Sequence, residues 1–157
     1  MGPGEPARTS ASELVAFEVA TRDLVGLALR SVEALEVSLS QFRLLLVLHE
    51  RGRSSSTQCA QALGVQGSSV TRLADRLHAS GHLVRGTDPG NRSVVTLELT
   101  DSGRGVVRQV RTRRRRELRR ALDRLDPAER AVCAAALEEL HRVVDAENPD
   151  PHHRLPL

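Results

Sequence analysis

Residues 64–103 read GVQGSSVTRLADRLHASGHLVRGTDPGNRSVVTLELTDSG, and this stretch decides the fold. Its first part predicts a helix that begins at Ser68 or Ser69. This helix has an apolar stripe at helical spacing, formed by Val70, Leu73 and Leu77. The preceding residues 54–65 predict a short helix that begins at a serine or threonine cap and that Gly64 closes. Two helices joined by a short turn containing glycine are typical of a helix-turn-helix.

The period of the sequence changes after Gly81. The short apolar segment HLVRG is followed by the turn cluster DPGN, and SVVTLELT then alternates between apolar and polar residues. This pattern predicts a two-stranded hairpin. A helix-turn-helix followed directly by such a hairpin, or wing, is the winged-helix arrangement, in which the second helix enters the major groove of DNA.

Helices are predicted on both sides of this segment, which makes the fold class mainly α with a small β-hairpin wing. Ser10 and Glu13 form a capping-box signature before a first helix. Ser40 is expected to cap a second helix, QFRLLLVLHER, whose unbroken apolar run indicates burial. A long helix is expected from Thr100 through Leu125. A last helix follows, and its start is marked by a cap, a first-turn proline and an acidic residue, Asp126, Pro127 and Glu129.

The composition fits one globular domain. The chain has 157 residues, of which 39% are hydrophobic, and no apolar run reaches the ~18 to 20 residues that a membrane span needs. The first residues show no signal-peptide pattern, so a cytoplasmic location is expected. Residues 1–11 and 147–157 are rich in proline and are expected to be disordered tails. Aromatic residues make up 1%, which argues against proteins that stack single-stranded bases on aromatic rings.

Charge is distributed unevenly along the chain. Arginines number 3 against 6 acidic residues before residue 41, 7 against 4 in 41–100, 10 against 3 in 101–125, and 3 against 7 thereafter. A basic middle between acidic ends suggests contact with a polyanion, although such a run is equally consistent with a solvated helix face. For Arg104, Arg108 and Arg111 the two interpretations are evenly balanced.

No pattern of an enzyme or a metal centre is present in the sequence. There is no nucleophile with a base, no metal triad and no glycine loop for phosphates, so we expect neither catalysis nor a cofactor. His78 and His82 are four residues apart, but Gly81 is expected to end the helix between them, which leaves a metal site as a minor alternative. Cys59 and Cys133 are expected to be small buried hydrophobic residues rather than redox switches.

In its middle the chain resembles the MarR family of bacterial transcription regulators. The match rests on LGV before the turn, SSVTRLADRLHASGHLVR across the second helix and the first strand, the D-P turn, and LT-x-x-G at the next helix. It covers about residues 12–146, with the winged helix at about 38–100 and the dimerisation helices at about 12–35 and 101–146. The resemblance implies a homodimer that binds a pseudo-palindromic operator in double-stranded DNA and acts as a ligand-responsive repressor.

The resemblance also assigns roles to individual residues. The DNA-binding residues are Gln66, Ser68, Ser69, Thr71, Arg72, Arg76, Arg85 and Arg92. The dimerisation residues are Leu14, Phe17, Val132, Ala136, Leu140 and Val143. Hydroxyl, amide and guanidinium groups suit contacts with phosphates and base edges. A small apolar effector is expected in an aliphatic pocket between the lobes, where His49 is a candidate contact; an ordinary hydrogen-bonded histidine is the alternative.

The wing departs from the family pattern. Where the family usually carries Asp-x-Arg at the wing tip, this chain has Asn91, Arg92 and Ser93. Either Arg92 still enters the minor groove from a repositioned tip, or the wing contacts only phosphate through Arg85 and Arg92. We favour a retained contact by Arg92. The alternative function is a winged helix that binds another protein without specific DNA binding, and it would lack a steep salt dependence.

Overall fold

The computed structural model describes residues 8–33 and 35–147. In this part of the chain the elements are α1 (Ala11–Glu33), α2 (Leu39–Arg51), β1 (Ser54–Ser55), α3 (Ser56–Leu63), α4 (Gly67–Ala79), β2 (Leu83–Thr87), β3 (Val95–Leu99), α5 (Asp101–Leu122) and α6 (Pro127–Glu147). Most of both expected tails, residues 1–7 and 148–157, lies outside the described residues. Each predicted tail is one residue too long at its inner border, because Ala11 and Glu147 are already helical.

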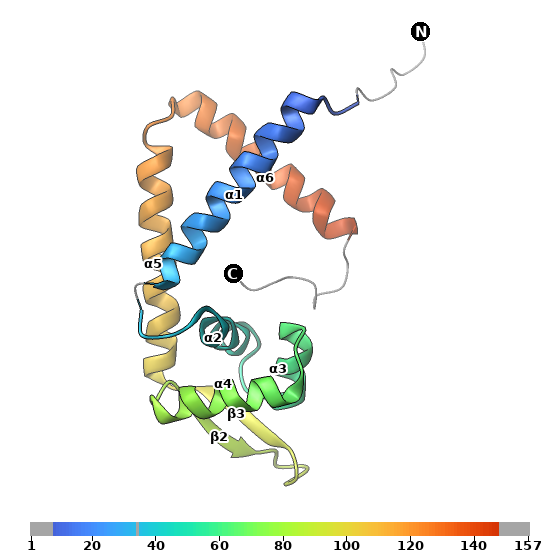
Figure 1. Cartoon of the computed structure of the whole chain (residues 1–157), viewed down its shortest axis with the longest axis vertical. Helices are drawn as coiled ribbons and strands as arrows, with labels where there is room; N and C mark the ends of the chain where they lie inside the picture. Colours follow the sequence, from blue (N-terminus) through green and yellow to red (C-terminus); the bar gives the residue numbers. More distant parts are fainter. Residues whose placement is uncertain (1–7, 34, 148–157) are drawn as a thin grey trace.

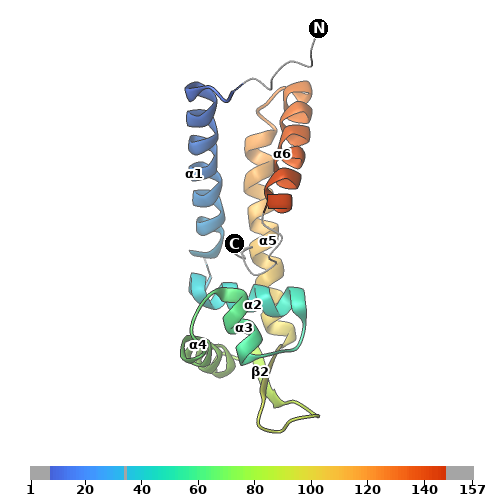
Figure 2. The same ribbon diagram turned by 90° about the vertical axis from the view of Figure 1, so that its right-hand side faces the viewer.

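The elements form two lobes that share α5 (Figure 1). The winged-helix lobe consists of α2, α3, α4, the three strands and the first half of α5. The helical lobe consists of α1, the second half of α5 and α6. The ribbons of α1 and α6 cross in Figure 1, but the view turned by 90° in Figure 2 shows them apart. None of the described helices is long and apolar enough to span a membrane.

Serine capping boxes begin three of the helices. At α1, the backbone N–H of Ser10 donates to Glu13 Oε2 (2.7 Å), and this bond lowers the pKa of the Glu13 carboxyl. At α2 the cap is Ser38, whose Oγ accepts from the N–H of Gln41 (3.2 Å), so the prediction of Ser40 was wrong. At α3 the cap is Ser55.

Two further helix boundaries differ from the expected ones. Helix α4 begins at Gly67, before Ser68 or Ser69, and its N-cap Gln66 makes no side-chain capping bond. Helix α5 ends at Leu122 instead of continuing to Leu125, because the chain turns at residues 123–126 toward α6.

The wing belongs to a three-stranded antiparallel sheet with the order β1-β3-β2. The hairpin of β2 and β3 was expected, and it pairs Leu83 with Leu99 and Thr87 with Val95. Strand β1 was not expected, because its two serines show no alternating apolar pattern. It pairs Ser54 with Leu97 and thereby joins the residues before α3 to the wing.

The hydrophobic core lies in the winged-helix lobe. Its largest fully buried side chains come from α2, the sheet, α4 and α5, and they are Phe42, Leu44, Leu45, Leu77, Leu83, Leu97, Val70, Val107 and Val110. The expectation that the apolar run of α2 is buried is confirmed, since Leu44 to Leu48 are all at most 5% exposed. In contrast, α6 contributes no buried residue.

The LT-x-x-G motif joins the sheet to α5 through close backbone contact. Thr100 caps α5, with its Oγ1 accepting from Gly103 N–H (3.1 Å) and donating to the carbonyl of Gly81 (2.7 Å). A side chain at Gly103 would collide with the carbonyl of His82 and with Leu99. Glycine is therefore required here for close approach, and this contact fixes α5 against the root of the wing.

Candidate DNA-binding surface

Helix α4 has one buried face and one exposed polar face. Val70, Ala74 and Leu77 are at most 1% exposed and pack into the core. The predicted DNA-binding residues of this helix lie on the other side: Ser69 is half-buried, and exposed positions are held by Gln66, Ser68, Thr71, Arg72 and Arg76. Burial of the apolar stripe thus turns the predicted contacts outward.

The first turn of α4 is left open to a ligand. Gln66 gives no side-chain cap, although its carbonyl accepts from the N–H of Ser69 (3.0 Å). The Thr71 hydroxyl donates to the carbonyl of Gly67 (3.1 Å), which holds its side chain along the helix. Backbone N–H groups at a helix N-terminus point along the axis and attract anions, so this end of α4 suits a phosphate.

Arg85 connects the wing to α4. Its Nη2 lies 2.7 Å from Asp75 Oδ1 and donates to the carbonyl of Thr71 (3.3 Å), so one guanidinium bridges strand β2 and helix α4. The Asp75 side chain is 57% exposed, and such a solvated pair contributes little to stability. Its geometry indicates that Arg85 fixes the angle between wing and helix, a role that the sequence did not suggest.

The wing tip is organised by Asp88 and Asn91. The Asp88 carboxylate accepts from the N–H groups of Gly90 (2.8 Å) and Asn91 (3.1 Å), and the Asn91 side chain accepts from Ser93 N–H (3.1 Å). Arg92, which lies between Asn91 and Ser93 in the sequence, is exposed. Asp88 and Asn91 thus order the backbone of the tip, and among the described residues Arg92 forms no ion pair with Asp88.

Arg53 holds the two wing strands together near their tip-side ends and was not predicted. It follows α2, its Nη2 donates to the carbonyl of Thr87 (2.6 Å), and its Nε donates to Thr96 Oγ1 (3.1 Å). A Cβ at Gly86 would come within 3.1 Å of Thr96 Oγ1 and 3.3 Å of Arg53 Nη2, which explains glycine in the strand. Glycine inside a predicted strand was the one available signal.

For three arginines of α5 the sequence did not decide between phosphate contact and solvation, and two of them pair within the chain. Arg104 forms an ion pair with Asp101 (3.1 Å), and Arg111 lies 3.8 Å from Glu50 Oε1 and 3.3 Å from His49 Nε2. Arg108 is exposed. The predicted effector contact, His49, is therefore half-buried beside Arg111 at the end of α2.

A cavity of about 450 Å³ lies between α1 and α5, toward the junction of the lobes, and it is lined by Ser31, Leu35, Arg108, Gln109, Thr112, Arg113 and Arg116. This cavity does not match the aliphatic pocket expected for an effector, because the guanidinium groups of Arg108, Arg113 and Arg116 line it. His49 is not among its lining residues.

The helical lobe exposes the side chains that were predicted to dimerise. The exposed fractions are 55% for Leu14, 51% for Phe17, 70% for Val132, 41% for Leu140 and 47% for Val143. Ala136 is exposed as well. Exposed apolar side chains along two helices are typical of surfaces that contact another protein.

The histidines and cysteines singled out in the sequence have ordinary surroundings. His78 Nδ1 lies 3.1 Å from the Leu83 carbonyl, and His82 Nδ1 lies 2.7 Å from Ser80 Oγ. Cys59 is buried, and burial raises the pKa of its thiol to about 11. Cys133 is exposed on α6, contrary to the expectation of burial.

Comparison with known proteins agrees with this geometry. A family profile described as MarR family matches residues 35–92, which span the helix-turn-helix and the wing tip. The chain is 28% identical over 111 residues to the HTH-type transcriptional regulator YfiV of Bacillus subtilis, an alignment that covers 71% of this chain and 69% of that protein.

Solved structures share this fold over most of the chain. The crystal structure of RV1404 from Mycobacterium tuberculosis is 32% identical with a TM-score of 0.79, and the match covers 89% of this chain and 97% of that one. A mutant of MepR from S. aureus, solved bound to an oligodeoxyribonucleotide, has the same fold at 20% identity and a TM-score of 0.67, over 87% of this chain and 99% of that one. The chain belongs to the MarR family of winged helix-turn-helix transcription regulators.

Proposed function

We propose that this protein is a cytoplasmic homodimer that binds a pseudo-palindromic operator in double-stranded DNA and represses transcription until a small ligand releases it. The observation that carries this proposal is the exposed polar face of α4, which lies beside a wing with an exposed arginine at its tip. The MepR mutant, which has the same fold, was solved with an oligodeoxyribonucleotide, which supports DNA binding by this fold.

In this mechanism the two recognition helices of a dimer enter successive major grooves. Arg72 and Arg76 reach guanine edges or phosphates, and Gln66 and the hydroxyls of Ser68 and Ser69 contact bases or backbone near the start of α4. Arg92 at the wing tip contacts the flanking backbone or minor groove. Specificity comes from α4, while the wings mainly add salt-dependent affinity.

The helical lobe sets the distance between the two recognition helices. The exposed apolar faces of α1 and α6 pack against those of a second copy, and α5 transmits their position to the winged-helix lobe. A ligand releases DNA only if it binds more tightly to a dimer whose helices no longer match the two half-sites. The arginine-lined cavity between α1 and α5 favours a ligand with an anionic group over the purely apolar one expected from the sequence.

The test is binding of labelled duplex from upstream of the coding region, measured by fluorescence anisotropy at several salt concentrations with random duplex as competitor. We expect selective binding with a steep salt slope for the unchanged protein. Replacing Ser69 and Arg72 together by alanine should abolish that selectivity, while Arg124→Ala, in the turn before α6, should leave it unchanged. Weak binding that is indifferent to sequence and salt would contradict the proposal.

A further inference from the structure

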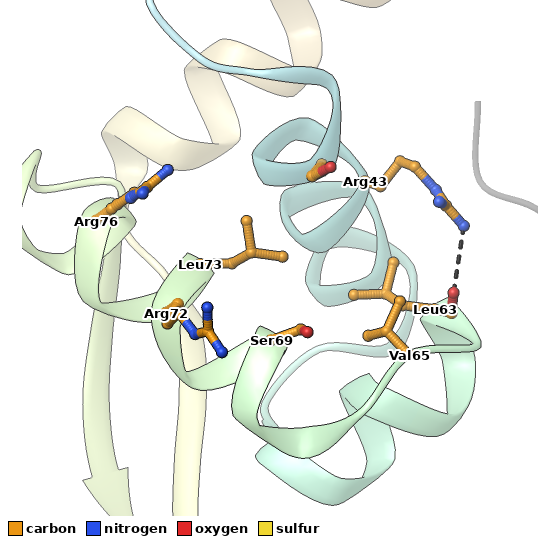
Figure 3. Close-up of a pocket in the computed structure, with 8 residues that line it drawn as sticks. Arg43, Leu63, Val65, Ser69, Arg72, Leu73 and Arg76 are labelled. Atoms are coloured by element: carbon orange, nitrogen blue, oxygen red, sulfur yellow. Dashed lines mark hydrogen bonds between the residues drawn. The ribbon is translucent and has the colours of Figure 1, made fainter.

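The winged-helix lobe also has a groove beside α4, on the side that faces α2. It has a volume of about 340 Å³ and is lined by Ser40, Arg43, Leu63, Val65, Ser69, Arg72, Leu73 and Arg76. We call it the α2–α4 groove. Figure 3 shows Leu73 pointing from α4 toward α2, with Arg76 on one flank and Arg43 on the other. Ser40 and Arg43 come from α2, which the sequence did not connect with DNA.

The α2–α4 groove carries three positive charges and no acidic lining residue. Arg72 and Arg76 take part in none of the ion pairs found among the described residues. Arg43 donates from Nη2 to the carbonyl of Leu63 at 3.4 Å, a long bond, and its buried Nε has no acceptor. A buried guanidinium nitrogen without an acceptor is costly, and an anion in the groove would supply further acceptors.

The shape of the groove favours an extended anion over an enclosed one. It is half-open, and the apolar side chains of Leu63, Val65 and Leu73 line it together with the charged ones. Small ligands are usually enclosed over most of their surface, which this groove does not allow. A DNA backbone needs only one side of contact, because its phosphate can meet the guanidiniums while the sugar lies on apolar side chains.

We propose that the α2–α4 groove holds a phosphate of the DNA backbone, with Arg43 and Ser40 of α2 as contacts additional to those of α4. The proposal rests on the proposed function, since Ser69, Arg72 and Arg76 belong to both surfaces. With α4 in the major groove, one backbone strand passes along the side of α4 that faces α2. The phosphate thereby connects the recognition helix α4 to α2. This connection fixes the depth of α4 in the major groove of the DNA.

The main test compares Arg43→Gln with Arg124→Gln, which removes the same charge in the turn before α6, far from the groove. The duplex is one selected in vitro from random sequences by the unchanged protein. For a dimer, Arg43→Gln should reduce the salt slope by about 1.8, two phosphate contacts' worth, and lower affinity roughly 10- to 100-fold. Arg124→Gln should change neither quantity.

Neutral methylphosphonates placed one at a time along the duplex identify the contact. In the unchanged protein each contacted phosphate loses affinity when it is neutralised. In Arg43→Gln one position per half-site should have lost its effect, while all others retain theirs. A variant that binds more weakly but keeps every penalty would show that Arg43 merely supports the fold, and an unchanged slope and profile would also overturn the proposal.

Ser40→Asp gives a second test that does not depend on removing Arg43. An acidic residue in the first turn of α2 favours the helix dipole, so thermal stability should be kept or raised. The same carboxylate should repel a phosphate in the groove and lower DNA affinity roughly tenfold, whereas Ser12→Asp on α1 should not. Unchanged DNA affinity in Ser40→Asp would overturn the proposal.

Two further outcomes separate this inference from the proposed function. If inorganic phosphate competes with DNA more than chloride at equal ionic strength, and Arg43→Gln removes this competition but no methylphosphonate penalty, the groove takes a free anion and the backbone contact is refuted. If the unchanged protein selects no duplex, the proposed function itself fails. If it selects one with a steep salt slope that Arg43→Gln leaves intact, only the inference about the groove fails.

Discussion

In the winged-helix lobe Leu44 and Leu45 of α2 are fully buried, whereas in the helical lobe Val132 of α6 is 70% exposed and Phe17 of α1 is 51% exposed. Both lobes contain regular helices, so the difference is not one of secondary structure. Burial of apolar surface supplies most of the stabilisation of a fold. One chain therefore completes the core of the winged-helix lobe, while the exposed apolar faces of the helical lobe support the proposed dimer.

The largest effect is expected for a core residue of the winged-helix lobe. Leu45→Ala should lower the free energy of unfolding by about 2–5 kcal/mol, because the removed side chain leaves a cavity in a fully buried site. Urea unfolding followed by circular dichroism measures this loss. Leu39→Ala, at a side chain that is 37% exposed on the same helix, should cost less than about 1 kcal/mol. Equal losses would contradict the location of the core.

The helical lobe should respond through association. Replacing Leu140 and Val143 together by glutamate places two charges on the exposed apolar face of α6 and should weaken dimerisation by roughly 100-fold or more, since the charges would be buried against a second copy. Sedimentation velocity over a range of protein concentrations measures this change. DNA affinity should fall as well, because a monomer contacts only one half-site of the operator.

The matched control places the same two charges elsewhere on α6. Ala131 and Ala134 are exposed and lie away from the stripe of Val132, Ala136, Leu140 and Val143. Glutamate at both should leave the dimer intact. If the two double variants dissociate alike, α6 is sensitive to charge in general and its apolar stripe is not the interface.

The reactivity of the two cysteines allows burial in the two lobes to be compared within one molecule. Burial keeps the Cys59 thiol protonated up to a pKa of about 11, so at pH 8 it should react with a thiol reagent at least about 100-fold more slowly than an exposed cysteine. Cys133, which is exposed on α6, should react readily in the variant with glutamate at 140 and 143. Adding Cys133→Ser to that variant should remove the fast reaction; a fast phase that remains would place Cys59 at the surface.

The same comparison explains how far sequence reasoning reached. The helix-turn-helix, the hairpin and the buried run of α2 were predictable, because apolar spacing and turn residues such as Gly64 determine them locally. Exposed apolar residues of α1 and α6 have the same spacing as buried ones. Pattern alone therefore predicts a covered face but does not distinguish cover by the same chain from cover by a partner.

The contacts that position the candidate site were not predictable. Arg53 reaches Thr87 and Thr96, and Arg85 reaches Asp75, across distances in sequence at which no periodic signal connects two residues. Charged residues on a surface look alike in sequence, whether they are free for DNA or bound within the chain. The roles of the arginines thus emerge only once the strands and helices bring specific pairs together.

The smallest effect concerns the boundary of α2, where sequence and structure disagreed by two residues. Both Ser38 and Ser40 precede the apolar run, but only Ser38 has Gln41 three residues later to close a capping box. Ser38→Ala should therefore cost about 1 kcal/mol in urea unfolding, while Ser40→Ala should change stability by less than half of that. A larger loss of stability for Ser40→Ala than for Ser38→Ala would identify Ser40 as the cap of α2. Because α2 carries the centre of the core, the result also tests whether the winged-helix lobe draws stability from its own helix caps as well as from burial.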